Sequence, residues 1–552
     1  MLQIDQIKML ISEHPQEERF FLQRQIERIL KISQKEIIDW KILKKSLDAR
    51  KKPKLYWIYR VAVTLTDEKT QAKALKSGKG TLVTEYRPVI YQPPALETGS
   101  KELLQERPVI IGTGPAGLLC GYQLACQGLR PILIERGKCL EQRKKAVEEF
   151  WNTGMLDQDT NVQFGEGGAG TFSDGKLQTQ VKDKTGRIHH ILKVFVEHGA
   201  PEEILFFSKP HVGTDILAVV VKRLREHMAA MGAEFYFETK MTGLLVRQEQ
   251  VCGVRVADRQ GECVIPTGHC ILCIGHSARD TFLTLYDQGV KMESKPFAVG
   301  LRVQHSQERI NEVQYGEGWR EKHLPSADYR LTYRAKNGRG IYSFCMCPGG
   351  YVVNASSELE RTAVNGMSYH GRDSGNANSA IVMTVDHTDY GEGVFDGMHF
   401  QQELEHRAYL QGGGKLALQR FSDFTAASSD GEADIMCAEA LQPKIKGQYL
   451  WGNLRGLLPD SLSRDFKDAM QYFGTVMDGF DRPDTILCGI ESRTSSPVKI
   501  LRDGDFQSNI RGLYPCGEGA GYAGGITSAA LDGLKVAEKI ILSYNGFVCS
   551  KS

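Results

Sequence analysis

The sequence predicts an α/β fold with three parts: a parallel sheet covered by helices, a mainly antiparallel β-domain inserted into it, and a small N-terminal α/β domain. Three observations support this prediction. A strand, a glycine-rich turn and a helix follow one another at residues 109–137, and strands and helices alternate from there to about residue 286. The middle of the chain is rich in aromatic, Gly, Ser and Asn residues. A second strand, glycine turn and helix then close the chain.

Composition narrows the class of protein. The 552 residues are enough for about two or three domains. Lys and Arg number 69 and Asp and Glu 67, so the formal charge is +2. A charge this close to zero does not indicate general binding to nucleic acid or to an acidic membrane. Thirteen cysteines without paired CxxC spacing fit reduced thiols. The N-terminus lacks the apolar core of a signal peptide, and no stretch reaches about 18 apolar residues, so we expect a cytoplasmic protein without a membrane span.

Residues 1–98 read as the N-terminal α/β domain. "EERFFLQRQIERILKI" has apolar residues at helical spacing, and "KLYWIYRVAVTL" is a β-branched and aromatic strand. The Pro, Gly-Ser and charged residues of "YQPPALETGSKELLQERP" indicate a linker. Six basic residues between Lys44 and Lys54 form a run that we interpret as a solvated edge, with RNA or protein docking as the alternative.

The remaining boundaries follow the changes in pattern. We expect the first part of the parallel-sheet domain at 99–290 and the inserted domain, with a helical segment near its end, at 291–484. The chain then returns to the parallel-sheet domain at 485–552.

The turn "GTGPAG" has the spacing of a dinucleotide-binding, Rossmann-like unit. Gly112 would allow the tight turn, Gly114 would let a pyrophosphate approach the backbone, and Gly117 would let the helix pack against the strand. The helix N-terminus would then face the phosphates. Glu135, at the tip of the next strand, is placed to accept hydrogen bonds from ribose hydroxyls.

The C-terminal stretch "LYPCGEGAGYAGGI" favours FAD over NAD. A carboxylate placed here, Glu518, would reach the ribityl hydroxyls of a flavin. The N-terminus of the following helix, with Gly524, Gly525 and Ile526, would lie along the flavin ring edge and stabilise the reduced flavin. The alternative interpretation is a purely structural glycine turn.

The chain resembles the glutathione-reductase-like flavoproteins that have one dinucleotide fold and an inserted substrate domain. More narrowly, "NVQFGEGGAGTFSDGKL", "SFCMCPGGYVV", "NGMSYHGRDSGNANSA", "GIESRTSSPVKILRD" and "GLYPCGEGAGYAGGI" are similar to a family of FAD-dependent dehydrogenases, or NAD(P)/FAD-dependent oxidoreductases, whose substrate is not established. The resemblance covers nearly the whole chain. It implies a fold and a non-covalent FAD, but no particular reaction.

The resemblance extends the predicted FAD site to further segments. Residues 165–176, "GEGGAGTFSDGK", match the glycine-rich stretch that runs beside the pyrophosphate and the flavin ring, and Gly275 ends a strand that returns to the FAD domain. We interpret His276 as a loop residue and not as a catalyst. The predicted cofactor contacts are Gly112, Gly114, Pro115, Ala116, Gly117, Glu135, Arg136, Gly168, Gly170, Thr171, Phe172, Ser173, Gly275, Gly517, Glu518, Gly524, Gly525 and Ile526.

The catalytic group is not fixed by any spacing. In the inserted domain, Arg372, Asn378 and Ser379 belong to a polar stretch that could line a substrate pocket or equally bond loop backbone. Cys345 and Cys347 would point to one face of a strand, and we favour buried structural thiols over a thiol beside the flavin. No metal site is expected.

The sequence therefore predicts an FAD-dependent dehydrogenase or reductase acting on a small organic molecule. The alternatives are a flavin electron carrier for a protein partner and, less favoured because of the neutral charge, an RNA-modifying flavoprotein. Only one complete dinucleotide fingerprint exists in the chain. NAD(P)H is therefore expected only as a transient donor, and a redox protein is an alternative partner. No membrane or nucleic-acid partner is expected.

Overall fold

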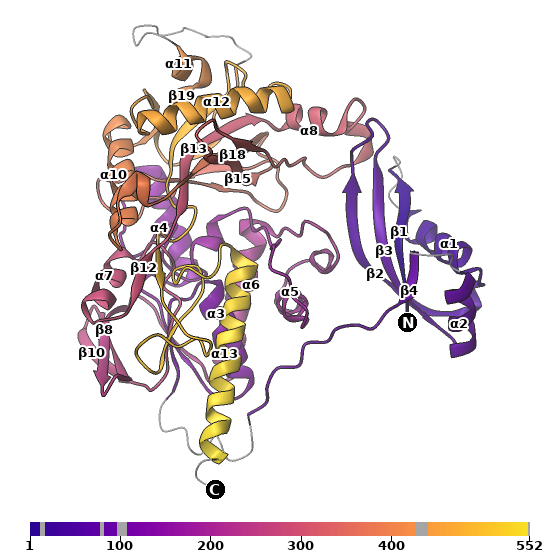
Figure 1. Ribbon diagram of the computed structural model, residues 1–552, viewed down its shortest axis with the longest axis horizontal. Helices are drawn as coiled ribbons and strands as arrows, with labels where there is room; N and C mark the ends of the chain where they lie inside the picture. Colours follow the sequence, from indigo (N-terminus) through magenta and orange to yellow (C-terminus); the bar gives the residue numbers. More distant parts are fainter. Residues whose placement is uncertain (12–16, 78–81, 97–106, 427–439, 550–552) are drawn as a thin grey trace.

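The computed structural model describes residues 1–11, 17–77, 82–96, 107–426 and 440–549, and part of the predicted linker, residues 97–106, lies outside these ranges. Within the described residues no helix is both long and apolar enough to cross a membrane. The predicted α/β class is confirmed. A parallel-sheet domain and a large β-domain form the main body, and the N-terminal domain lies at one side of it (Figure 1).

The N-terminal domain has the β-α-β-β-α-β order of ferredoxin-like folds, with its sheet in the order β2-β3-β1-β4. Leu22, Ile26 and Leu30 lie on one face of α1 and pack with Val61 and Val63 on the sheet, as the helical spacing predicts. The other sheet face turns away from both helices (Figure 1). The elements are β1 (Leu2–Leu10), α1 (Glu18–Leu30), β2 (Ile37–Asp48), β3 (Tyr56–Leu65), α2 (Glu68–Ser77) and β4 (Val83–Glu85).

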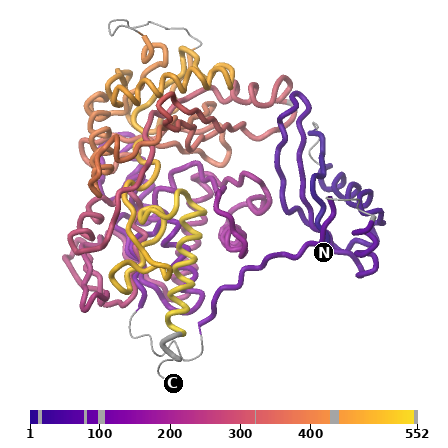
Figure 2. Tube along the Cα trace, viewed as in Figure 1, coloured from indigo at the N-terminus to yellow at the C-terminus, as the bar shows by residue number. Residues whose placement is uncertain are grey.

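The parallel sheet has the order β24-β11-β5-β6-β7, and all its neighbours run parallel. One face packs on α3, α6 and α13, and the other on the antiparallel sheet β10-β9-β8. The C-terminal segment lies beside the glycine turn although the two are far apart in sequence (Figure 2). The elements are β5 (Val109–Ile111), α3 (Pro115–Cys126), β6 (Ile132–Ile134), α4 (Leu140–Thr153), α5 (Arg187–Glu197), α6 (Gly213–Ala230), β7 (Glu234–Tyr236), β8 (Lys240–Arg247), β9 (Gln250–Asp258), β10 (Gly261–Pro266), β11 (Cys270–Leu272), α7 (Arg279–Asp287), β24 (Leu513–Pro515) and α13 (Ile526–Cys549).

The inserted domain is built on a seven-stranded, mainly antiparallel sheet, β14-β15-β18-β13-β22-β19-β21. Its central strand β13 is buried along almost its whole length, because β18 and β22 flank it and helices such as α12 cover the sheet. The elements are β13 (Phe297–Ser306), α8 (Gln307–Tyr315), β14 (Thr332–Arg334), β15 (Gly340–Cys347), β16 (Tyr351–Asn354), β17 (Val364–Met367), β18 (Asn376–Val385), α9 (His387–Tyr390), α10 (Asp396–Gln411), β19 (Leu416–Arg420), α11 (Phe421–Thr425), β20 (Ile445–Lys446), β21 (Tyr449–Trp451), α12 (Asp460–Val476) and β22 (Ile486–Glu491).

The structure shifts the end of the inserted domain relative to the predicted boundary at residue 484. Strand β22 follows that residue, yet it pairs with β13 and β19 inside the seven-stranded sheet. The two crossings between the domains lie next to each other, because β12 (Met292–Ser294) pairs with β23 (Val498–Ile500). This paired crossing brings both ends of the insertion to the edge of the parallel-sheet domain.

Candidate cofactor and substrate site

A cavity of about 380 Å³ lies at the carboxyl ends of four parallel strands, where ligands bind in open α/β sheets. Ile111, Ile134, Cys273 and Cys516 mark these strand ends in its wall. Most of the predicted cofactor contacts line the same cavity, namely Gly112, Gly114, Pro115, Ala116, Glu135, Arg136, Gly168, Gly170, Ser173, Gly275, Glu518, Gly524, Gly525 and Ile526. Segments far apart in sequence therefore meet at one place.

The three glycines of the first turn have different surroundings. A Cβ on Gly112, whose φ is +98°, would lie 2.3 Å from the Cys273 carbonyl oxygen, and one on Gly117 would lie 2.0 Å from the Gly112 carbonyl oxygen. Backbone packing therefore leaves no room for a side chain at either position. A Cβ on Gly114 would instead meet only the Gly168 Cα, at 3.8 Å, and would enter the cavity. Gly114 is therefore the position where a ligand can approach the turn, and Gly117 lies behind the wall.

Glu135 is held by four hydrogen bonds from the protein. Its Oε2 accepts from the Thr113 backbone N–H (3.0 Å) and hydroxyl (2.8 Å), and its Oε1 accepts from the backbone N–H groups of Gly137 (3.1 Å) and Gly165 (3.0 Å). The carboxylate lines the cavity and also joins the glycine turn to the 165–168 loop. The predicted hydrogen bonds to a ribose would add to this set. Thr113, which sequence reasoning missed, fixes the orientation of the carboxylate.

Arg143, on α4, organises the loop that carries Gly168. Its guanidinium is fully buried and donates to the carbonyl oxygens of Asn161, Val162, Gly165, Glu166 and Gly168 at 2.7–3.1 Å. Burial lowers the pKa of Arg143 to about 10, and Glu135 and Glu166 oppose that change. Sequence reasoning missed this residue, because an arginine in a charged helix is typical of a solvent-facing position.

Three other predicted contacts lie behind the cavity wall. Thr171 and Phe172 are buried in the short 3₁₀ helix Ala169–Phe172, where Phe172 lies edge-on to the Trp151 ring. Gly517 donates its N–H to the Asp532 carboxylate (2.8 Å), which itself pairs with Arg502. These residues support the wall and do not form it.

The C-terminal turn places an unusual carboxyl group in the cavity. Burial raises the pKa of Glu518 to about 7, and the positive charge of Lys295 opposes this shift. His276 Nε2 lies 3.7 Å from Glu518 Oε1, and burial together with Arg493 and Arg279 lowers the pKa of His276 to about 3. The His276 ring is therefore neutral at physiological pH. His276 also lines the cavity, so it lies beside the predicted cofactor site and not in a remote loop.

The inserted domain closes the other end of the cavity with Phe344, Cys345, Cys347, Asn365 and Gly366. Cys345 has a φ of +41°, which breaks the strand alternation that predicted two thiols on one face. The Cys347 thiol donates to the Cys345 carbonyl oxygen (3.2 Å). Cys347 is buried but Cys345 is exposed, so the prediction of two buried thiols is wrong for Cys345. Burial raises the pKa of Cys347 to about 12, so this thiol stays protonated at neutral pH.

The structure places the three predicted substrate residues behind this wall. Arg372 pairs with Asp174 (2.8 Å), and Asp174 does line the cavity. Asn378 and Ser379 lie on the buried strand β18, next to the central strand, where Asn378 accepts from Arg302 (2.8 Å) and Ser379 bonds the Tyr329 hydroxyl (2.8 Å). A polar stretch that resembled a loop is thus partly a core strand, and it orients the residues that face the cavity.

A buried ion pair lies at the end of the cavity that the inserted domain forms. Arg302 donates through Nε and Nη2 to the two carboxylate oxygens of Glu491, each at 2.8 Å, and through Nη1 to Asn378. Glu491 itself lines the cavity. A Cβ on Gly366 would lie 2.2 Å from Arg302 Nη1, so glycine is required where the chain passes this guanidinium.

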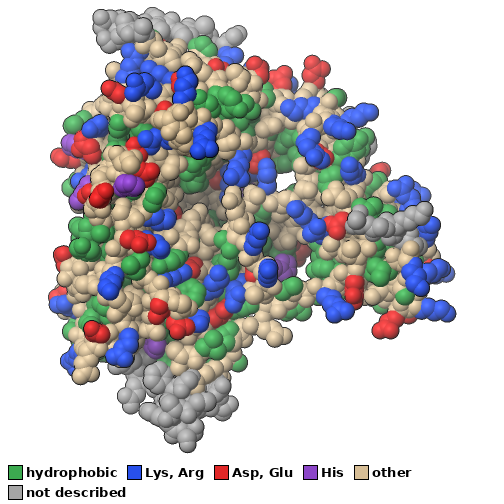
Figure 3. Space-filling model, in the orientation of Figure 1, with side chains coloured by type: hydrophobic (Ala, Val, Ile, Leu, Met, Phe, Trp, Pro, Cys, Tyr) green, Lys and Arg blue, Asp and Glu red, His purple; other side chains and the backbone are tan. Residues whose placement is uncertain are grey.

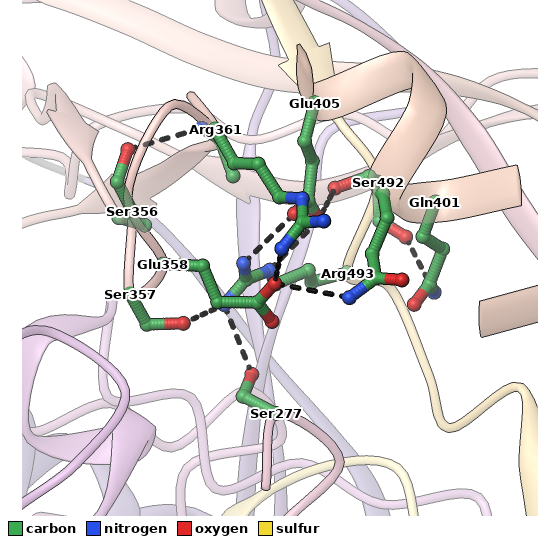
Figure 4. Close-up of polar contacts among 12 residues, drawn as sticks. Ser277, Ser356, Ser357, Glu358, Arg361, Gln401, Glu405, Ser492 and Arg493 are labelled. Atoms are coloured by element: carbon green, nitrogen blue, oxygen red, sulfur yellow. Dashed lines mark hydrogen bonds and ion pairs between the residues drawn. The ribbon is translucent and has the colours of Figure 1, made fainter. Parts of the chain in front are cut away.

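A second buried network joins the two domains. Glu405, on α10, is fully buried and accepts from Arg279 and Arg493 through four hydrogen bonds of 2.9 Å, with a fifth from Ser492 at 2.7 Å. Figure 4 shows Glu405, Ser492 and Arg493 with Ser277 and Glu358 around them. Arg493 and Ser277 line the cavity, so this network positions the wall where the domains meet.

Comparisons with known proteins identify the family. Residues 296–494 match the family described as FAD-dependent protein, C-terminal domain-like, and residues 1–64 match a domain of unknown function. An uncharacterised protein of Clostridium beijerinckii is 42% identical over 529 residues, which cover 95% of this chain and 96% of that protein. The chain belongs to the same family. Its inserted domain is that of FAD-dependent proteins, which implies FAD binding.

Solved flavoprotein structures resemble the chain only distantly. A flavin-dependent brominase matches with a TM-score of 0.37 at 12% identity, over 79% of this chain and 80% of the brominase. The glycerol-3-phosphate dehydrogenase of Bacillus halodurans, complexed with FAD, matches with a TM-score of 0.35 at 12% identity, over 81% and 65% of the two chains. At these values the likeness says nothing about activity.

The glycine positions of this family member fit a flat cofactor. A Cβ built on Gly275, Gly524 or Gly525 would meet no atom within 4 Å, and all three residues line the cavity. Together with Gly114 they form a cradle that side chains would fill. The chain can therefore lie close to an extended ligand from the first turn to the start of α13.

Proposed function

We propose that the chain is an FAD-dependent oxidoreductase that acts on a small organic molecule held by the inserted domain. One observation supports this most strongly. The cavity that contains the glycine cradle continues to Phe344, Cys345, Cys347 and Asn365 of the inserted domain, so cofactor and substrate would share one cavity. A cavity that extends beyond the cofactor end offers room for a bound molecule, whereas a pure electron carrier needs only an exposed cofactor edge.

The chain's own residues have separable roles in this proposal. Gly114 and the first N–H groups of α3 would hold the pyrophosphate, Glu135 the ribose and Glu518 the ribityl chain. Bound FAD would supply two-electron redox chemistry. The inserted domain would exclude water. Asp174 would act as a fixed acceptor, because burial raises its pKa but Arg372 and Lys176 lower it further, leaving it ionised.

Anaerobic mixing of the oxidised and of the chemically reduced protein with a panel of metabolites tests the proposed activity. We expect one class of small molecule to exchange electrons with the flavin, either by bleaching the oxidised form or by restoring the visible absorbance of the reduced form, at a rate that saturates with concentration. NADH or NADPH alone should reduce the protein slowly, because α3 is the only helix in a complete dinucleotide fingerprint. Two outcomes would contradict this part of the proposal: bound FAD that exchanges electrons with no metabolite in either direction, and fast saturable reduction by NAD(P)H alone.

Replacing Glu518 with alanine should weaken FAD retention without unfolding the chain. The variant loses charge-assisted hydrogen bonds worth roughly 1.5–3 kcal/mol, which corresponds to about a 10- to 150-fold rise in the Kd. Equilibrium titration of the apoprotein with FAD measures the change. An unchanged Kd would show that the carboxylate does not contact the cofactor.

The raised pKa of Glu518 also predicts a pH dependence of apoprotein stability. Between its ordinary value of 4.5 and about 7, the group binds a proton in the folded state and loses it in the unfolded state, so stability falls as pH rises through this window. Glu518→Gln removes that loss. Urea unfolding should show an advantage for the variant that grows from pH 5 to pH 8 and then levels off. A constant difference across this range would mean that the carboxyl group titrates normally.

A further inference from the structure

The open face of the N-terminal sheet is positively charged. Val61 and Val63 of β3 face the core, so strand alternation turns Arg60 and Ala62 to the other face. Residues directly opposite each other in an antiparallel pair share a face. By this rule Lys41 (opposite Ala62), Lys44 (opposite Arg60) and Lys8 (opposite Ile58) all lie on the open face, and all three are exposed.

Helix α5 of the main body brings further positive charge toward this face. His189 and Lys193, four residues apart, are exposed on α5, and the loop before it carries the exposed Lys182 and Lys184. Burial lowers the pKa of His189, and so do the positive charges of Lys193 and, from across the gap, Lys41. Figure 3 shows Lys and Arg side chains on both sides of the opening between the N-terminal domain and the main body. We use the name basic cleft for the open sheet face with Lys8, Lys41 and Lys44 together with α5 and its preceding loop with Lys182, Lys184 and Lys193.

Acidic side chains do not neutralise the lysines of the basic cleft through ion pairs among the described residues. Among the described residues none of its six lysines makes an ion pair, whereas Lys45, on the other face of β2, pairs with Glu18 (2.6 Å). Three carboxylates also lie on or beside the open face: Asp5 pairs with Arg60, Asp48 (opposite Tyr56) pairs with Arg50, and Asp39 is exposed. With an overall charge of only +2, this is a local concentration of positive charge.

The N-terminal domain is bonded to the main body beside the cleft, and a short segment connects the cleft to the cavity. Strand β2 is attached to the main body where Lys45 N–H donates to the Phe206 carbonyl oxygen (2.8 Å) and Ser208 N–H to the Lys45 carbonyl oxygen (2.9 Å). Lys176 and Gln178 line the cavity and lead within a few residues to Lys182. The Thr527 hydroxyl, in the first turn of α13, donates to the Leu177 carbonyl oxygen (2.7 Å) and fixes this segment beside the cofactor end.

We propose that the basic cleft docks a small acidic electron-transfer protein, which donates electrons to the flavin, and the organic molecule bound by the inserted domain accepts them from the flavin; this rests on the function proposed above. The sequence has a single dinucleotide fingerprint, so the reductant of its cofactor is otherwise unassigned. Complementary charge gives fast and salt-sensitive association of such proteins. Single-stranded nucleic acid is less suited, because Tyr56 is the aromatic side chain on the open face of β3, and base stacking needs several such rings.

The test measures binding and reduction of the full-length holoprotein by a reduced ferredoxin of strongly negative net charge. Calorimetry should show association at about 30 mM salt that weakens at least about tenfold at 300 mM. Lys41→Glu combined with Lys193→Glu should weaken binding by at least about tenfold and slow flavin bleaching. Lys69→Glu combined with Lys76→Glu, on the exposed face of α2, should change neither.

Different results would contradict different parts of the proposal. Equal binding by the two double variants, or no binding at low salt, would overturn the docking site. Tighter binding of polyuridylate than of ferredoxin would assign the cleft to RNA. Calorimetry does not depend on flavin turnover, and each protein's FAD content is read from its spectrum. A wild-type protein that binds ferredoxin but contains no FAD would therefore overturn the oxidoreductase function and leave the docking surface standing.

Discussion

Replacing Gly114 with valine will give a folded protein that purifies without FAD. The built Cβ at this position enters the cavity and meets only Gly168 Cα, so the branched side chain would occupy the place of the pyrophosphate and not disturb the fold. The position differs from Gly112 and Gly117, where any side chain would collide with backbone carbonyl groups. The ratio of flavin absorbance to protein absorbance after gel filtration measures the loss.

Gly504→Val provides the matched control for that experiment. Gly504 is an exposed loop residue whose built Cβ also meets no atom within 4 Å, but it does not line the cavity. This variant should keep its FAD. Circular dichroism should be the same for both variants and the wild type. If Gly114→Val retains FAD at the wild-type ratio, the cofactor does not approach this turn.

Replacing Glu405 with alanine will cost about 3–5 kcal/mol of unfolding free energy, because it leaves two buried guanidinium groups without their shared carboxylate. Arg279 and Arg493 are each 5% exposed, and Glu405 is fully buried. Burial raises the pKa of Glu405, but the two arginines lower it well below its usual range. Its contribution to stability is therefore complete above pH 5 and is lost only as the pH falls into the strongly acidic range. Urea unfolding at pH 7 measures the effect.

Glu403→Ala is the control on the same helix. Glu403 pairs with Arg407 at the surface, four residues along α10, and removing such an exposed pair should change stability by less than about 0.5 kcal/mol. If Glu405→Ala fails to fold, Glu405→Gln keeps one acceptor oxygen and should show a smaller loss in the same assay. Equal stability of the Glu405→Ala and Glu403→Ala variants would mean that the buried network does not hold the domains together.

The parts of the fold that depend on local pattern were predictable from the sequence. The strand, turn and helix at 109–126 follow from glycine spacing that only one backbone geometry satisfies, and the structure explains each glycine separately. The helix from Ile526 follows from a second turn of the same kind. Strand β1 was missed, because a β-bulge between Ile4 and Ile7 interrupts the alternation of buried and polar residues that indicates a strand.

The residues that hold the site together were not predictable in the same way. Arg143 and Glu405 lie in helices whose sequences are rich in charge, so each resembles a solvent-facing residue, and only the tertiary packing buries it. Arg302 and Glu491 are far apart in the chain and meet because β13 and β22 are neighbours. Conversely, Asn378 and Ser379 resemble loop residues but lie in a buried strand, where neighbouring side chains bond their polar atoms.

Measuring the FAD content of the purified full-length protein is the most direct test of the central claim, that both ends of the parallel-sheet domain form one flavin site beside the inserted domain. Denaturation followed by filtration separates free from attached flavin, and the absorbance of the filtrate gives the stoichiometry. The account predicts a yellow protein that releases one FAD per chain without covalent attachment. A colourless protein that takes up no added FAD would contradict it.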